Sequence, residues 1–467
     1  MREYIFSFII LLCCNTSLQS QAIQQRLAQA VKVFESDSQM RNAIVSLYVA
    51  DAITGKKVFA HNERFGLAPA STQKIFTSIA AFELLGNNYR YKTDLAYSGK
   101  IENGSLQGKL YIISNGDPTL GSWRYADTKE GFLLNNWANA IKTQNITSIG
   151  QGISAIASNQ NWSPAFIPDG WIWQDIGNYY GAGAGFLNWR ENQYDLVLRS
   201  GSKTGDSVHI VTTKPKLHNA TLQSFVTTGA PGSGDNAYIY LPPFATSGIV
   251  RGTIPPNEKA FVISGSFPDP ASQLCMTLAD KLRENQISVK SFSPNSEKYN
   301  SANLKIITTH QSPPLDSMNF YFMRRSINLY GEAFVKTIAL EKTGVADTDT
   351  GIRVVRDFFK NIGIEKSALQ IIDGSGLSPQ NRVTTEAEVL ALIYARKQPW
   401  FRSFYLSLPE YNGMKMKSGS IGGARAYAGY HTARDGKQYV FSIIVNNYKG
   451  SASAVVRKMY KVLDVLK

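Results

Sequence analysis

The sequence predicts an α/β fold in which an antiparallel sheet with helices is split by a large β-rich insertion. Two observations carry this prediction. The two ends of the chain resemble each other, because each combines paired strands with amphipathic helices. The middle differs from both, with short strands and turns rich in Gly, Pro and Ser. We therefore expect the first strands to pair with the last ones in one sheet. Three sequential domains are the alternative on pattern alone.

The N-terminal part supplies the first half of this sheet. Residues 23–36 have a helical period, and residues 43–62 predict two strands around a turn at Thr54-Gly55. The segment "PASTQKIFTSIAAFELLG", residues 69–86, then predicts a helix that ends at its glycine. The order is helix, strand, strand, helix.

The region after this helix is β-rich. Residues 91–121 predict a hairpin with a turn at Asn103-Gly104. Further short strands are expected within 201–217 and 238–270. A helix is expected at 270–285, where Cys275 is interpreted as a small core residue.

The C-terminal part again combines helical patterns with paired strands, as the N-terminal part does. Helical patterns occur at 317–344 and 384–398. Residues 414–450 predict two strands about Asp435-Gly436, and residues 451–467 predict a final helix.

The first 22 residues predict an export signal. Arg2 is followed by the short apolar run "FSFIILLCC" and by Ser20-x-Ala22, a small-residue cleavage site. The run is too short to cross a membrane. Lipidation at Cys13 or Cys14 fits poorly, because neither follows a small residue. Whether the signal is cleaved or lipidated stays open, and the mature chain is expected to be exported, periplasmic and soluble.

The net charge of +14 suits nucleic acid, an anionic membrane surface or an acidic polymer of the cell envelope. Export and the scattered placement of the basic residues argue against nucleic acid. Peripheral membrane contact stays open. The 5 histidines lack metal-ligand spacing, so we expect no metal and no other cofactor.

A Ser-x-x-Lys pair opens the helix expected at 69–86. Ser71 and Lys74 are three residues apart and so share a helix face. A lysine neutralised in a dry pocket takes the proton of a serine and makes it a nucleophile. The alternative is that Ser71 caps the helix and Lys74 is solvated. A lone match is weak, since Ser200 and Lys203 form a second one among turn residues.

Two later motifs extend this pair. Ser326 and Asn328 lie in "RRSINLYGE", and Lys417, Ser418 and Gly419 lie in "MKSGSIGG". The trio Ser-x-x-Lys, Ser-x-Asn and Lys-Thr-Gly carries acyl transfer in penicillin-binding proteins and class A β-lactamases. The third motif needs an edge strand whose small residue lets the substrate backbone approach.

Literal Lys-Thr-Gly occurs at two other places, and we reject both. The match at Lys203 lies in the insertion. The match at Lys342 ends a helix, where Gly344 has the position of a C-cap. Only the segment from Lys417 opens a strand with a hairpin partner, and its Ser418 keeps a hydroxyl where threonine is usual.

With these motifs the chain resembles class C penicillin-binding proteins, the D-alanyl-D-alanine carboxypeptidase/endopeptidase family. The resemblance covers nearly the whole mature chain. It is carried by "ASTQK", "GDPTL", "GWIWQDIGNYYGAGAG", "MRRSINLYGE", "DGSGLSPQNRVT" and "KSGSIGG". It implies a penicillin-binding/serine β-lactamase-like catalytic domain and two inserted domains. The catalytic domain would take residues 23–92 and 303–467, inserted domain II residues 93–183 and 281–302, and inserted domain III residues 184–280.

The resemblance also implies a serine hydrolase that acts on peptidoglycan stem peptides through an acyl-enzyme and is inhibited covalently by β-lactam antibiotics. Ser71 would attack the carbonyl of the penultimate D-alanine, with Lys74 as general base. Ser326 would pass the proton to the leaving D-alanine, and Asn328 would orient the peptide and Lys74.

The third motif would bind the substrate's carboxyl end. Lys417 and Ser418 would bind the terminal carboxylate, next to Gly419, and the backbone N–H groups of Ser71 and Ser420 would form the oxyanion hole. Asp373, in "DGSGLS", is expected to shape a turn rather than to take part in catalysis.

Two other functions stay open at this point. A serine β-lactamase shares the three motifs, although it needs no large insertion. A non-catalytic wall-binding protein could retain the fold, although the motif residues argue against decay. The balance of carboxypeptidase and endopeptidase action is not set by the sequence.

Overall fold

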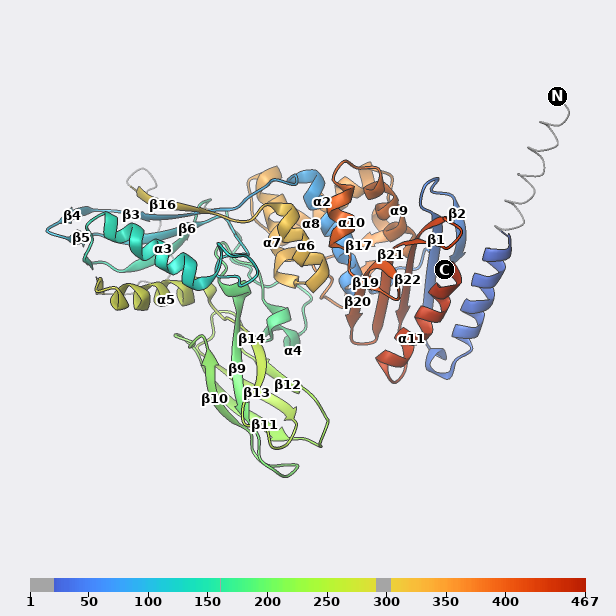
Figure 1. Cartoon of the computed structure of the whole chain (residues 1–467), viewed down its shortest axis with the longest axis horizontal. Helices are drawn as coiled ribbons and strands as arrows, with labels where there is room; N and C mark the ends of the chain where they lie inside the picture. Colours follow the sequence, from blue (N-terminus) through green and yellow to red (C-terminus); the bar gives the residue numbers. More distant parts are fainter. Residues whose placement is uncertain (1–20, 160, 291–303) are drawn as a thin grey trace. The chain divides into compact units, whose positions relative to one another are not determined.

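The computed structural model describes residues 21–159, 161–290 and 304–467. The predicted export signal falls almost entirely outside them. The chain divides into two compact units. The terminal unit comprises the residues up to Leu84, Asn319–Ser326 and Ile352–Lys467, and the inserted unit comprises Leu85–Met318 and Ile327–Gly351. The α/β prediction, with the two ends of the chain in one unit, is confirmed (Figure 1). The finer division into three domains stays a prediction.

The terminal unit is built on a six-stranded sheet of order β19-β20-β21-β22-β1-β2, in which all neighbouring strands are antiparallel. The strands are β1 (Ile44–Asp51), β2 (Lys57–His61), β19 (Glu410–Tyr411), β20 (Met414–Ile421), β21 (Ala424–Thr432) and β22 (Gln438–Asn446). β1 pairs with β22 along its whole length. The first and last strands therefore meet as the sequence predicts.

Helices cover both faces of this sheet because side chains alternate along each strand. Leu47 and Val49 of β1 join the core formed with the helix at 21–35 and with α11 (Ala452–Leu463). On the other face Ser46 bonds Thr385 of α9 (Thr385–Arg396) at 2.7 Å. The remaining helices with residues in this unit are α2 (Lys74–Leu84), α6 (Leu315–Arg325), α8 (Thr348–Asn361) and α10 (Phe401–Ser407).

The C-terminal segment differs from prediction in one respect. The sequence predicts two strands in 414–450, whereas the structure has three, β20, β21 and β22. A turn at Gly422-Gly423 separates the first two, and Gly423 has a left-handed φ of 71°. Gly-Gly is itself a turn signal, which the prediction of two strands overlooked.

The inserted unit contains several small sheets. One has the order β16-β3-β6-β8 and another the order β15-β7-β5-β4, and two three-stranded sheets have the orders β10-β9-β14 and β11-β13-β12. The strands are β3 (Lys92–Tyr97), β4 (Lys100–Glu102), β5 (Ser105–Gln107), β6 (Leu110–Ser114), β7 (Ser148–Ile149), β8 (Ile153–Ala157), β9 (Gln193–Arg199), β10 (His209–Lys214), β11 (Thr221–Thr228), β12 (Asn236–Tyr240), β13 (Ser247–Ile254), β14 (Phe261–Ser266), β15 (Ser288–Val289) and β16 (Lys305–Gln311). The helices are α3 (Glu130–Thr143), α4 (Trp173–Ile176), α5 (Pro270–Glu284) and α7 (Asn328–Thr343).

Local predictions for this unit are confirmed where a specific residue type governs the backbone. Asn103 and Gly104 join β4 to β5 with φ values of 50° and 78°, the left-handed pair that a two-residue hairpin needs. Gly344 ends α7 with a φ of 78°. Cys275 is 1% exposed within α5, in the core of the unit.

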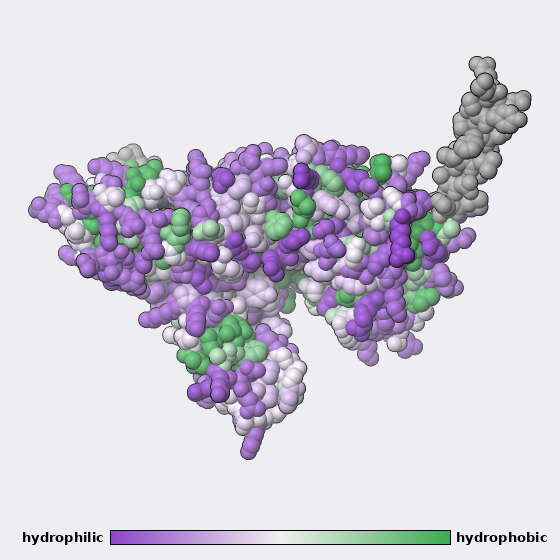
Figure 2. Space-filling model, viewed as in Figure 1, coloured by the Kyte–Doolittle hydropathy of each residue, from purple (hydrophilic) through white to green (hydrophobic). Residues whose placement is uncertain are grey.

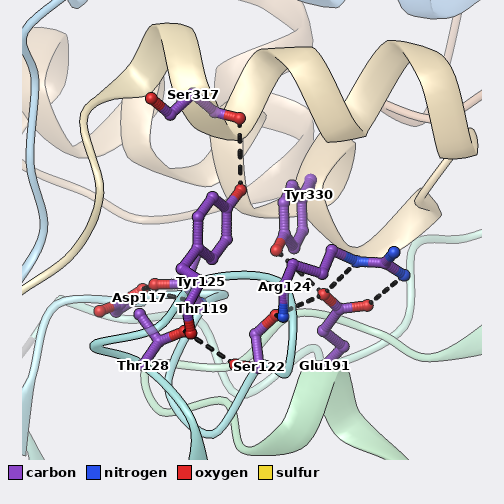
Figure 3. A network of polar contacts seen from close by, with 9 residues as sticks. All are labelled: Asp117, Thr119, Ser122, Arg124, Tyr125, Thr128, Glu191, Ser317 and Tyr330. Atoms are coloured by element: carbon purple, nitrogen blue, oxygen red, sulfur yellow. Dashed lines mark hydrogen bonds and ion pairs between the residues drawn. The ribbon is translucent and has the colours of Figure 1, made fainter.

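A buried polar network ties α7 to two loops of the inserted unit (Figure 3). The Glu191 carboxylate accepts hydrogen bonds from Arg124 at 2.7 and 3.0 Å and from Ser122 at 2.8 Å. The Tyr330 hydroxyl, in the first turn of α7, donates to the same carboxylate at 3.0 Å. The negative charge of Glu191 is thus compensated on several sides.

On the face seen in Figure 2, hydrophilic residues predominate and hydrophobic residues form separate small patches. Within the part of the chain that the structure describes, no helix has the length and apolar character that a membrane span requires.

Candidate active site

The Ser71 segment is a tight turn that leads directly into α2. Residues Ala70–Gln73 form a 3₁₀ turn, and Lys74 is the first residue of α2. The Lys74 side chain is fully buried, and its Nζ lies 3.0 Å from Ser71 Oγ. Ser71 is not a helix cap, because Pro69 has the capping position and no side chain bonds there. The alternative of a capping serine and a solvated lysine is therefore wrong.

The loop that begins at Asp373 wraps this turn with three successive backbone carbonyls. The Asp373 carbonyl accepts from Gln73 Nε2 at 2.5 Å. The next two carbonyls accept from Thr77 Oγ1 at 2.6 Å and from Lys74 Nζ at 2.7 Å. The Lys74 amine therefore contacts both the Ser71 hydroxyl and a fixed carbonyl.

Asp373 shapes this loop as predicted. Its carboxylate accepts the backbone N–H groups of Gly376 at 2.8 Å and Ser378 at 2.7 Å, and the Asn381 amide at 2.9 Å. Gly376 has a φ of 79°, and a Cβ there would lie 2.0 Å from the Ala70 carbonyl oxygen. Only glycine allows the loop to approach the serine turn this closely.

A second serine and lysine meet in the same unit. Lys417 of β20 is 1% exposed, and its Nζ donates to Ser326 Oγ at 3.0 Å and to the Ser418 carbonyl at 2.9 Å. Ser326 has a left-handed φ of 56°. Burial, together with the positive charge of Lys74, lowers the pKa of Lys417 well below its usual value.

The rest of the third motif borders the serine turn. A Cβ on Gly419 would lie 2.2 Å from the Pro69 carbonyl oxygen, so β20 and the turn are in close contact. Ser418 is half-buried and its hydroxyl lies 3.4 Å from the Tyr411 hydroxyl. Ser420 is exposed on the same strand.

The structure therefore brings most of the predicted residues into one unit. Asn328 begins α7 in the inserted unit, two residues after Ser326, and its Nδ2 donates to the Tyr180 carbonyl at 2.7 Å. The rejected Lys203 and Lys342 are exposed residues of the inserted unit. Among the described residues, no three His, Cys, Asp or Glu side chains are grouped to hold a metal ion.

Comparison with known proteins identifies the family to which this site belongs. Residues 27–410 match the D-Ala-D-Ala carboxypeptidase 3 (S13) family. The chain belongs to this family. As an S13 carboxypeptidase it is a serine-type hydrolase, and the resemblance found in the sequence is confirmed.

Relatives of the S13 chain align with most of its length. A D-alanyl-D-alanine carboxypeptidase of Actinomadura sp. (strain R39) is 25% identical over 461 residues, which cover 92% of this chain and 83% of the relative. A crystal structure of penicillin binding protein 4 from Haemophilus influenzae superposes with a TM-score of 0.77 at 20% identity, covering 95% of this chain and 98% of that one. The same protein complexed with a β-lactam gives a TM-score of 0.73 at 19% identity, covering 94% and 99%.

Two features of this S13 site escaped sequence reasoning. One is the Ser375 carbonyl, which contacts Lys74 from 301 residues away. Its loop stood out in the sequence, but a backbone carbonyl leaves no residue-type signal. The other is Glu388 of α9, a fully buried carboxyl that accepts from Ser442 at 2.5 Å. Its position in a run of acidic and apolar residues resembles an ordinary helix face.

Proposed function

We propose that this S13 protein is an exported, periplasmic D-Ala-D-Ala carboxypeptidase or endopeptidase that cleaves peptidoglycan stem peptides through an acyl-enzyme on Ser71. The observation that carries the proposal is the fully buried Lys74, whose Nζ lies 3.0 Å from the Ser71 hydroxyl. A base within hydrogen-bond reach of the nucleophile is the requirement for activating a serine.

In the proposed acylation, Lys74 in its unprotonated form takes the proton of Ser71 as Oγ bonds to the carbonyl carbon of the penultimate D-alanine. The proton then passes through Ser326 to the nitrogen of the leaving D-alanine as the C–N bond breaks. The backbone N–H groups of Ser71 and Ser420 stabilise the oxyanion. Water finally hydrolyses the Ser71 ester.

In the same proposal, Lys417 and Ser418 bind the terminal carboxylate of the substrate, Gly419 admits its backbone, and Asn328 orients the peptide. The close approach of Gly419 to the serine turn supports a strand that presents the substrate carbonyl to Ser71. The Lys417–Ser326 hydrogen bond supports a shared proton path. β-Lactams would acylate Ser71 as covalent inhibitors, which the β-lactam complex of the Haemophilus relative supports.

Labelling with a fluorescent penicillin tests the proposal. We expect the wild type to carry a stable label and Ser71→Ala to carry none. Loss of one half-buried hydroxyl destabilises the fold by only about 1 kcal/mol, so the variant should remain folded. Label that persists on Ser71→Ala would refute the nucleophile. A label lost rapidly from the wild type would favour the β-lactamase alternative, and a wild type without label would favour a non-catalytic wall-binding protein.

A further inference from the structure

The loop of residues 165–184, between β8 and β9, is held closed at its two ends. A Cβ on Gly183 would lie 2.2 Å from the Phe166 carbonyl oxygen, so the two ends run in close contact. Within the loop, a Cβ on Gly181 would lie 1.9 Å from the Asp175 carbonyl oxygen. The glycines of "YYGAGAG" thus allow a tightly packed loop whose ends meet.

Lys336 of α7 joins these two ends. Its Nζ donates to the Ala165 carbonyl and to the Ala184 carbonyl, each at 2.7 Å, and the residue is 1% exposed. Burial lowers the pKa of Lys336 to about 8, while the negative charges of Glu332 and Asp347 act in the opposite direction. An ammonium in such a place is costly unless it is well bonded, and bonds from a charged donor are strong.

The same loop contacts the start of the same helix. Tyr180, near the C-terminal end of the loop, accepts a hydrogen bond from Asn328 Nδ2 at 2.7 Å through its backbone carbonyl. Asn328 is the first residue of α7, and Lys336 follows two turns later. The Tyr180 carbonyl accepts from Nδ2 and so fixes the orientation of the Asn328 amide.

We propose that Lys336 is a positioning residue for Asn328, because it locks the ends of the loop that carries the Tyr180 carbonyl. The proposal rests on the peptide-orienting role assigned to Asn328 above. Loss of the two Lys336 hydrogen bonds would loosen the loop and with it the Tyr180 carbonyl that accepts from the Asn328 amide.

A double-mutant cycle tests this coupling. Lys336→Met keeps an unbranched side chain of nearly the same length and removes its donors. We expect it to lower kcat/KM for a D-Ala-D-Ala peptide roughly ten-fold in the wild-type background. In an Asn328→Ala background it should cause almost no further loss, because both changes remove one function. Additive losses would overturn the proposal.

Amide hydrogen exchange gives a second readout that needs no activity. Exchange in residues 165–184 should quicken in Lys336→Met and less so in Lys336→Gln, which keeps a neutral NH2 donor group on a shorter side chain. Unchanged exchange rates would show that Lys336 does not hold the two ends of the loop together, even if the protein lacked the proposed activity. Should Lys336→Met fail to fold, the Gln variant supports both measurements.

Thr337→Val is the matched control. Thr337 is the next residue of α7, and its hydroxyl bonds the Ala333 carbonyl at 2.7 Å and Tyr91 at 2.8 Å, away from the loop. Any loss it causes should add to that of Asn328→Ala and leave exchange in the loop unchanged. If Thr337→Val coupled to Asn328 as strongly as Lys336→Met, general loosening of α7 would replace the clamp as the explanation.

Discussion

In the inserted unit, the buried carboxylate of Glu191 faces the Arg124 guanidinium and two hydroxyls (Figure 3). In the terminal unit, the buried carboxyl of Glu388 accepts a hydrogen bond from the Ser442 hydroxyl, and the nearby Thr72 hydroxyl also acts to lower its pKa. Burial raises the pKa of Glu388 to about 7, and those hydroxyls offset only part of the shift.

The lysines of the two units differ in their surroundings, although burial lowers the pKa of both. Lys336 of the inserted unit bonds two backbone carbonyls, whereas Lys417 of the terminal unit bonds the Ser326 hydroxyl and experiences the charge of Lys74. Charges with compensating partners hold a structure together. At Lys417 a like charge adds to burial in lowering the pKa, and shifts of this kind are typical of sites that move protons.

The largest expected effects come from neutralising the two buried carboxyls, which should act in opposite directions. Glu191→Gln leaves Arg124 without its counter-charge and should lower the free energy of unfolding by about 3 kcal/mol. We place the effect at the low end of such changes because the Arg124 side chain is 16% exposed.

Glu388→Gln should instead stabilise the protein at alkaline pH. The Glu388 pKa is about 7 in the folded chain and 4.5 in the unfolded chain, so the folded state holds the proton more tightly. The stability present below pH 4.5 is therefore lost as the pH rises through 7. The glutamine avoids this loss and should gain about 3 kcal/mol over wild type at pH 8, with little difference near pH 4.5. Calorimetric unfolding at both pH values measures this. If Glu191→Gln and Glu388→Gln changed the free energy of unfolding at pH 8 in the same direction, the two buried carboxyls would not differ as proposed.

The next largest effect concerns Lys417. If Lys417 binds the terminal carboxylate, Lys417→Ala should slow acylation by peptides with a free C-terminus roughly ten- to a hundred-fold. A substrate with an amidated C-terminus should already be poor and should lose much less. The acylation rates of the two substrates, measured on the wild type and on Lys417→Ala, form a double-mutant cycle. Equal losses would mean that Lys417 acts through its Ser326 bond and not by reading the carboxylate.

The smallest effects are expected at the two rejected lysines. Lys203→Ala and Lys342→Ala remove exposed ammonium groups of the inserted unit, so acylation should stay within about two- to three-fold of wild type. Penicillin labelling rates measure both. A large loss from either variant would show that the third motif was assigned to the wrong lysine.

Sequence reasoning succeeded where chemistry depends on local spacing. The Ser71–Lys74 contact follows from a separation of three residues, and the hairpin at Asn103-Gly104 follows from left-handed backbone preference. The pairing of β1 with β22 followed from the likeness of the two ends.

Reasoning from sequence failed where the partner is a distant backbone atom. The carbonyls of Ser375 and Tyr180 contact Lys74 and Asn328, and any residue type would supply the same carbonyl. The turn at Gly422-Gly423 was missed for a different reason: the segment was divided only at Asp435-Gly436, although Gly-Gly is also a turn signal. The family motifs identified the candidate site residues, whereas the contacts of these backbone carbonyls can be seen only in the folded structure.

The pairing of β1 with β22 also sets an order of assembly. β1 precedes the inserted unit in the chain, whereas its partner at Gln438–Asn446 is made only after that unit. The inserted unit has all its residues once Gly351 is made, and domains generally fold as units. The terminal sheet depends on contacts distant in sequence, which form slowly. The Ser71 turn can thus pack against β20 only after residues 414–421 have been made, so a chain that stops before them lacks the strand that borders the nucleophile.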